Sequence, residues 1–150
     1  MKKSRGFSLI ELLIVVAIIL VIAAIAIPNL MKSKMAANES SAVGSMRTLT
    51  TSELTYASVN PSTGYTSLAN LGSAGLIDTT LAGGSKSGFS FAIGTSGTPA
   101  IGFTSNANPI TPGTTGTNYY CSDQTAVIQM GAASFGTSSN PCSGGTPIGN

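Results

Sequence analysis

The strongest pattern in this sequence is an unbroken run of sixteen apolar residues from Leu12 to Ile27. Extending the segment back to Phe7 gives 21 residues, interrupted only by Ser8 and Glu11. A helix of that length spans roughly 31 Å, which matches a bilayer core of about 30 Å. The pattern predicts a membrane-spanning helix. The three basic residues among the first six place its N-terminal end in the cytoplasm.

Beyond Ile27 the chain turns polar but keeps a helical pattern to about residue 57. One stripe at helical spacing carries most of the apolar side chains of this stretch: Met35, Ala42, Met46, Leu49 and Ala57. Glu39 and Glu53 fall on the same face, so the stripe is not purely apolar. The turn cluster Asn-Pro-Ser-Thr-Gly at residues 60–64 predicts the end of the helix.

Residues 58–150 contain short segments that alternate between apolar and polar positions. Residues 88–93 and 100–104 predict one hairpin, and residues 118–121 and 126–129 predict a second. Such a sheet has one apolar face that needs a cover, and the outer half of the helix is the candidate. The predicted fold class is α+β: a long N-terminal helix with a small antiparallel sheet packed on its distal half.

The composition argues against several classes of function. Only 8% of the 150 residues are charged, the formal net charge is +2, and there is no His. The low charge argues against a nucleic-acid partner. The missing His removes the commonest general base, and two Cys cannot fill a usual zinc site. We therefore expect no enzyme activity, no cofactor and no metal site.

The residues before the apolar run form a specific motif. Lys-Lys-Ser-Arg-Gly-Phe-Ser-Leu-Ile-Glu, ending at Glu11, resembles the class III leader of type IV pilins and type II secretion pseudopilins. The resemblance implies cleavage after Gly6 by a prepilin peptidase, N-methylation of the new N-terminal Phe7, and a role for Glu11 in filament assembly. Pro28 stands where many family members carry a helix-bending Pro.

The chemistry of the motif supports this interpretation. A carboxylate inside a membrane segment costs up to about 2.5–3.5 kcal/mol and usually has a partner. In a stack of identical helices, the Phe7 amine of one subunit can meet Glu11 of its neighbour. Breaking such a buried pair costs about 3–5 kcal/mol, so the pair would set the register of the filament.

Cys121 and Cys142 are the two cysteines of the chain. If residues 58–150 lie outside the cytoplasm, we expect a disulfide, worth roughly 3 kcal/mol in the chain-entropy model. Their loop also resembles the C-terminal disulfide loop of many type IV pilins. Two unpaired buried cysteines are the alternative.

The resemblance implies a structural subunit of a type IV pilus, or fimbrium. Its parts would be a leader (1–6), a transmembrane and assembly helix (7–28), a distal half-helix (29–57) and a β-rich outer domain (58–150). Its partners would be membrane lipid before assembly, the prepilin peptidase and methylase, the inner-membrane assembly machinery, and further copies of itself in a helical homopolymer on the bacterial surface.

Three other interpretations stay open at this stage. A pseudopilin of a type II secretion system shares the leader. A monomeric membrane-anchored binding domain would have the same helix but no cleavage at Gly6. An ordinary signal peptide, cut after the A-x-A pattern at residues 24–26, would place Glu11 inside its hydrophobic region.

Overall fold

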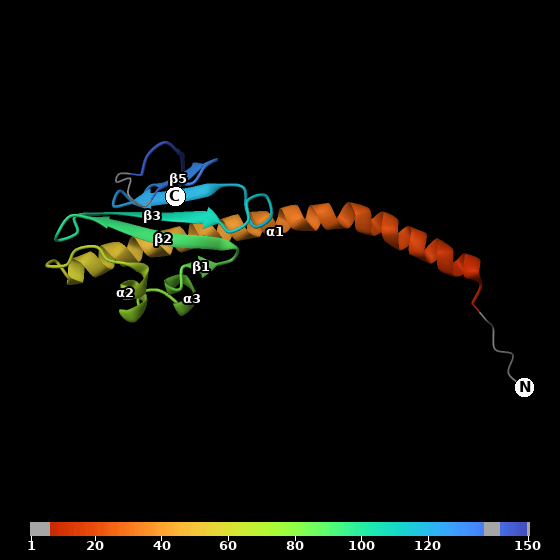
Figure 1. Ribbon diagram of the computed structural model, residues 1–150, viewed down its shortest axis with the longest axis horizontal. Coiled ribbons are helices and arrows are strands. Elements are labelled where there is room, and N and C mark those ends of the chain that lie inside the picture. The colour runs from red at the N-terminus through yellow and green to blue at the C-terminus, as the bar shows by residue number, and fades with distance from the viewer. Residues whose placement is uncertain (1–6, 137–141, 150) are drawn as a thin grey trace, which may run out of the picture. The chain divides into compact units, whose positions relative to one another are not determined.

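The computed structural model describes residues 7–136 and 142–149. The chain divides into an N-terminal unit (residues 1–34) and a C-terminal unit (residues 35–150), each of which is described by itself. The helix α1 (Leu9–Val59, 51 residues) begins in the N-terminal unit, after residues 7 and 8, and continues into the C-terminal unit (Figure 1). Its continuity past Ile27 confirms the helical pattern of the polar stretch.

Within the C-terminal unit, α1 buries the middle of the predicted stripe, while Met35 and Ala57 at its ends are half-buried. Ala42, Met46 and Leu49 have no exposed surface, because positions three and four apart share one face of a helix. Glu53 is also fully buried on this face and Glu39 is half-buried. The two charged positions therefore belong to the inward face rather than interrupting it.

A six-stranded antiparallel sheet packs on α1, with its strands in sequence order from β1 to β6. Every connection between neighbouring strands is local, as in a meander. The strands are β1 (Ser85–Lys86), β2 (Phe89–Ser96), β3 (Gly102–Pro109), β4 (Tyr119–Asp123), β5 (Ile128–Gly131) and β6 (Thr146–Ile148). The two central hairpins, β2–β3 and β4–β5, are the two predicted from the alternating segments.

The observed elements differ from the expected ones in extent and number. The β2–β3 hairpin is longer than predicted, and Ser122 and Asp123 end strand β4 instead of forming the turn. The sequence pattern also missed β1 and β6, which are two and three residues long. It missed α2 (Leu68–Ser73) and α3 (Thr79–Ala82) as well. Segments this short have no periodicity of their own.

One apolar cluster holds the C-terminal unit together. It joins α1 to the inner face of the sheet and to α2 and α3 through these buried residues: Ala42, Met46, Leu49, Leu71, Ile77, Leu81, Phe89, Phe91, Ala107, Tyr120 and Ile128. The outer half of the helix thus covers the sheet, as expected. Burial of this kind supplies most of the free energy that stabilises a small domain.

Candidate assembly site and the contacts that secure the C-terminal unit

The first turn of α1 brings three residues of the leader motif together. Phe7 is 81% exposed and precedes the helix. The backbone N–H of Ser8 donates a 2.9 Å hydrogen bond to Oε2 of Glu11, and the Ser8 carbonyl accepts one from Leu12. Ser-x-x-Glu is a capping-box spacing, in which the Glu side chain turns back to the residue before the helix. The carboxylate of Glu11, four residues beyond Phe7, is therefore held at the helix start by the N–H of the Phe7–Ser8 peptide bond. Gly6 lies outside the described residues.

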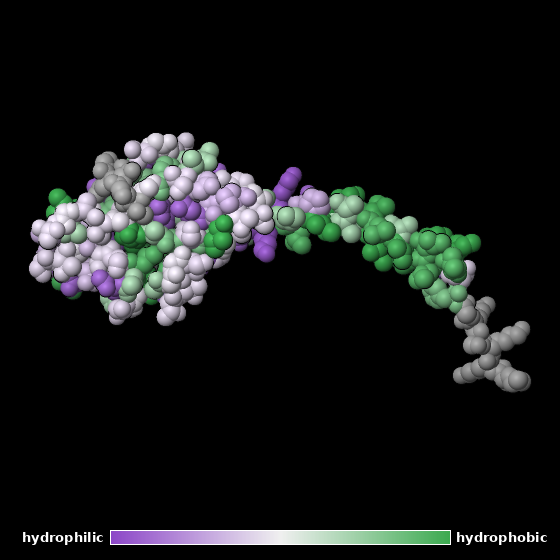
Figure 2. Space-filling view, in the orientation of Figure 1, coloured by the Kyte–Doolittle hydropathy of each residue, from purple (hydrophilic) through white to green (hydrophobic). Residues whose placement is uncertain are grey.

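The N-terminal unit exposes almost all of its apolar side chains. None of the most apolar 18-residue stretch of α1 is buried. Figure 2 shows this segment as a nearly continuous hydrophobic surface. It is the one helix among the described residues that is long and apolar enough to cross a membrane. A surface of this kind needs lipid or other helices around it.

Pro28 lies inside α1, where the helix continues on both sides of it. Proline has no N–H, so the carbonyl of Ala24 lacks its usual intrahelical donor. The position is 17 residues beyond Glu11, so the structure does not bring it to the first turn. Its predicted role as a kink or stretch point remains a prediction.

Glu39 connects α1 to the segment between β3 and β4. Its carboxylate accepts four hydrogen bonds, of 2.7–3.1 Å, from the backbone and side chains of Thr117 and Asn118. Partial burial raises the pKa of Glu39, but these hydrogen bonds outweigh it and hold the pKa below its ordinary value of 4.5. Burial and the charge of Glu39 raise the pKa of neighbouring Tyr120 to about 12. Glu39 is thus ionised at neutral pH and holds the segment in place.

Glu53 is buried with far fewer hydrogen bonds than Glu39. It is fully buried, and only its Oε2 is hydrogen-bonded, by the backbone N–H of Thr66 at 2.9 Å. Its Oε1 is buried without a hydrogen-bond partner. Burial raises the pKa of Glu53 to about 7, although the Thr66 hydrogen bond works against this. A carboxyl group in this position favours its neutral form.

The structure joins Cys121 on β4 to Cys142 in a disulfide, with their Cα atoms 6.1 Å apart. Two further contacts hold Cys142 in place. Its backbone N–H donates to Oδ2 of Asp123 at 2.9 Å, and its carbonyl accepts from Nε2 of Gln129 at 2.7 Å. The C-terminal segment is therefore docked by hydrogen bonds as well as by the covalent bond.

Sequence reasoning missed the structural roles of Glu39, Glu53 and Asp123. The signal for the first two was present, since a charged residue at a position of the inward stripe requires a partner when buried. Asp123 gave no such signal for its contact with Cys142, which lies 19 positions further along the chain.

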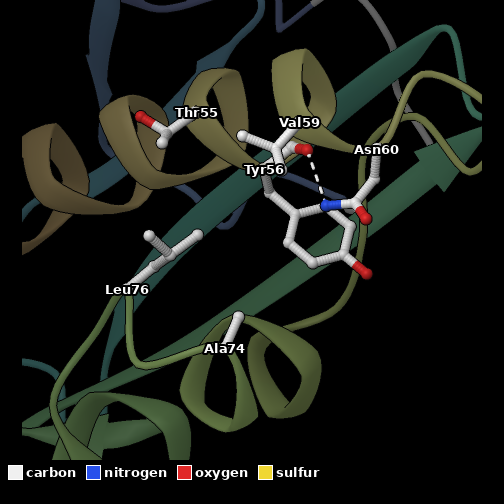
Figure 3. A pocket seen from close by; sticks show the side chains of 6 residues that line it. All are labelled: Thr55, Tyr56, Val59, Asn60, Ala74 and Leu76. Carbon is white, nitrogen blue, oxygen red and sulfur yellow. Dashed lines mark hydrogen bonds between the residues drawn. The ribbon is translucent and has the colours of Figure 1, made fainter.

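Three cavities lined by described residues of the C-terminal unit hold no cluster of reactive groups. Figure 3 shows one of about 140 Å³ at the end of α1. Its lining is mainly apolar, and Tyr56 is the only titratable residue among these: Thr55, Tyr56, Val59, Asn60, Ala74 and Leu76. Among the described residues, no three His, Cys, Asp or Glu side chains gather as metal ligands would.

Comparisons with known proteins agree with the leader motif. Residues 1–27 match the family model of the prokaryotic N-terminal methylation motif. The chain is 46% identical over 54 residues to the type IV major pilin protein PilA of Myxococcus xanthus, covering 36% of this chain and 24% of that protein. It is 54% identical over 39 residues to the type IV wide pilus major component PilA4 of Thermus thermophilus, covering 26% and 30%.

These alignments span less than a third of either relative, and no solved structure matches the chain. The C-terminal unit is characterised by its fold alone, a small antiparallel sheet packed on the helix. In its leader motif, its apolar N-terminal helix and its α+β fold, the chain is similar to type IV pilins.

Proposed function

We propose that this chain is a structural subunit of a type IV pilus. It is made as a precursor, cut after Gly6, methylated at Phe7 and stored in the inner membrane. It then polymerises into a filament on the cell surface. The observation that carries the proposal is an exposed apolar helix that directly follows the methylation motif. Both relatives are named as major pilus components, which favours a pilin over a pseudopilin.

The helix of the N-terminal unit would serve two states in turn. In the membrane, lipid covers its apolar surface, and Glu11 is hydrogen-bonded to Ser8 of its own chain. In the filament, the same surface packs against the helices of other copies, and Glu11 meets the Phe7 amine of a neighbour. Because the pair is desolvated there, a wrong register leaves two unpaired charges in an apolar core.

We assign no catalysis to this chain. The reactions at Gly6 and Phe7 are carried out on it by the prepilin peptidase and methylase. The C-terminal unit coats the filament with a surface rich in hydroxyl groups, because it contains 36 of the 39 Ser and Thr residues of the chain.

The test is the intact mass and N-terminal sequence of the protein in fibres sheared from cells. We expect a chain that begins at methylated Phe7 and lacks two hydrogens at Cys121 and Cys142. A chain that begins at Phe7 but stays in the membrane fraction supports a pseudopilin instead. A chain that keeps residues 1–6 supports a monomeric anchored domain.

The variant Glu11→Ala tests the assembly mechanism. It should be processed and held in the membrane but absent from fibres, because the amine of the neighbour loses its partner. The control is Leu13→Ala in the same turn region, which removes apolar surface but no charge and should still assemble. Normal fibres from Glu11→Ala would contradict the role in register.

A further inference from the structure

Two lysines follow directly after the apolar part of α1. Lys32 and Lys34 come after Met31, and both are exposed. From Leu9 to Met31 the helix rises about 33 Å, slightly more than the hydrocarbon core of a bilayer. With the first turn at the inner surface, both lysines lie at the level of the outer lipid headgroups.

Neither lysine has an acidic partner among the described residues. The one ion pair there joins Lys86 to Asp78 in the C-terminal unit. Glu11 is the carboxylate of the N-terminal unit, and it lies 21 residues, or about 31 Å, further down the same helix. Two ammonium groups at the edge of an apolar surface therefore face outward without a counter-charge.

A second copy of the chain is a poor source of that counter-charge. Every carboxylate of the described C-terminal unit is already engaged within its own subunit. Glu39 and Asp123 each hold a loop or terminal segment, Glu53 is fully buried, and Asp78 pairs with Lys86 at 2.9 Å. Recruiting one of these carboxylates would break contacts that stabilise the fold.

The placement of the two lysines favours a planar partner. Residues two apart on a helix point about 200° away from each other, so Lys32 and Lys34 lie on opposite sides of α1. A single protein surface can contact one of them. A layer of headgroups surrounds the helix and can contact both, while the aliphatic stems stay along the apolar surface.

Processing changes how the basic residues are distributed between the two sides of the membrane, and this step rests on the proposed function. The precursor has three basic residues in its first six, on the cytoplasmic side. Cleavage after Gly6 removes all three. Lys32 and Lys34 then remain as the basic side chains next to the membrane, on its outer side.

We propose that Lys32 and Lys34 form a binding site for the phosphate groups of anionic lipids in the outer leaflet, which holds the processed subunit at a fixed depth before assembly. Each lysine near an anionic surface contributes an attraction worth about five-fold in association. The contact is lost when the subunit leaves the bilayer for the filament.

The test uses the full chain from Phe7, reconstituted in phosphatidylcholine vesicles with a trace of spin-labelled lipid. Electron spin resonance gives the relative association of labelled phosphatidylglycerol and labelled phosphatidylcholine with the protein. We expect wild type to prefer phosphatidylglycerol about five-fold or more, and high salt to reduce this preference. Lys32→Gln with Lys34→Gln should lose about five-fold or more of it.

Two matched variants separate position from charge. Lys86→Gln removes the half-buried lysine of the C-terminal unit that pairs with Asp78, and it should keep the wild-type preference. Lys32→Arg with Lys34→Arg keeps both charges and should keep it too. A double Gln variant as selective as wild type would overturn the proposal. So would a preference that appears only at high protein density, which would indicate contacts between copies.

This result is independent of whether fibres form, because it is measured on the unassembled subunit. Absence of the wild-type protein from sheared fibres would contradict the pilin function and leave the lipid preference standing. Normal fibres without a lipid preference would overturn the lysine site alone.

Discussion

Oε1 of Glu39 on α1 accepts a 2.7 Å hydrogen bond from the backbone N–H of Thr117, 78 positions further along the chain. The same carboxylate accepts three more hydrogen bonds from Thr117 and Asn118. One turn of helix and one loop are therefore joined by a single ionised side chain. The contact fixes how the segment after β3 returns to the sheet as β4.

Replacing Glu39 with Ala should lower the free energy of unfolding by about 2–4 kcal/mol, because it leaves two backbone N–H groups of the loop without acceptors. The folded pKa of Glu39 lies below 4.5, so its contribution is fully present above that pH and is lost as the pH falls through the folded pKa. Urea unfolding of the detergent-solubilised chain measures both effects. Ser40→Ala, at the next and exposed position, should change stability by less than about 0.5 kcal/mol.

Glu53 should show the opposite pH dependence. Its folded pKa is about 7 against an ordinary 4.5, so the contribution of Glu53 to stability is greatest below pH 4.5 and falls as the pH rises to 7. Glu53→Gln removes the ionisation but keeps an acceptor for Thr66. It should be about 2–3 kcal/mol more stable than wild type at pH 8, after allowance for solvent screening.

The control for Glu53 is the same pair of proteins at pH 4, where both side chains are neutral and their stabilities should agree within about 1 kcal/mol. A constant difference between Glu53→Gln and wild type from pH 4 to pH 8 would mean that the carboxyl group does not titrate in this range.

Long periodic features of this fold were predictable from sequence. The apolar run and the helical stripe each extend over several turns, so α1 was expected close to its observed length. The alternation around Phe89 and Phe91 likewise predicted β2, because its inward positions are buried in the core. These features are determined locally, by the repeat of the chain itself.

Features that depend on partners far along the chain were not predictable. The helices α2 and α3 were missed for a different reason: their caps, Ser67 and Asp78, are local, but six and four residues are too few to show a periodic pattern. The strand β6 contains Pro147 and forms at a sheet edge, where proline is tolerated. The four hydrogen bonds of Glu39 belong to the same class, since no local pattern connects it to Thr117.

Removing the disulfide by Cys121→Ser with Cys142→Ser should cost about 3 kcal/mol of stability, as expected for a closed loop of this length. Strand β6 should nevertheless stay paired with β5, because Asp123 and Gln129 still hold the backbone of residue 142. Amide hydrogen exchange at Thr146–Ile148 measures this. Adding Asp123→Ala to the double variant should make these amides exchange faster, and fast exchange in the double variant alone would contradict the role of Asp123.

Two glycines should respond in opposite directions to replacement by Ala. A Cβ at Gly116 would lie 2.5 Å from Cζ of Phe89, whose ring is fully buried in the core. Gly116→Ala should therefore destabilise the protein by about 1–3 kcal/mol, because the ring has no room to move.

Gly44 is exposed within α1, and a Cβ there meets nothing within 4 Å. Gly44→Ala should stabilise the unassembled subunit by about 1 kcal/mol through helix propensity alone. Urea unfolding in detergent checks both changes, and equal effects of the two substitutions would contradict the packing of Phe89 against Gly116.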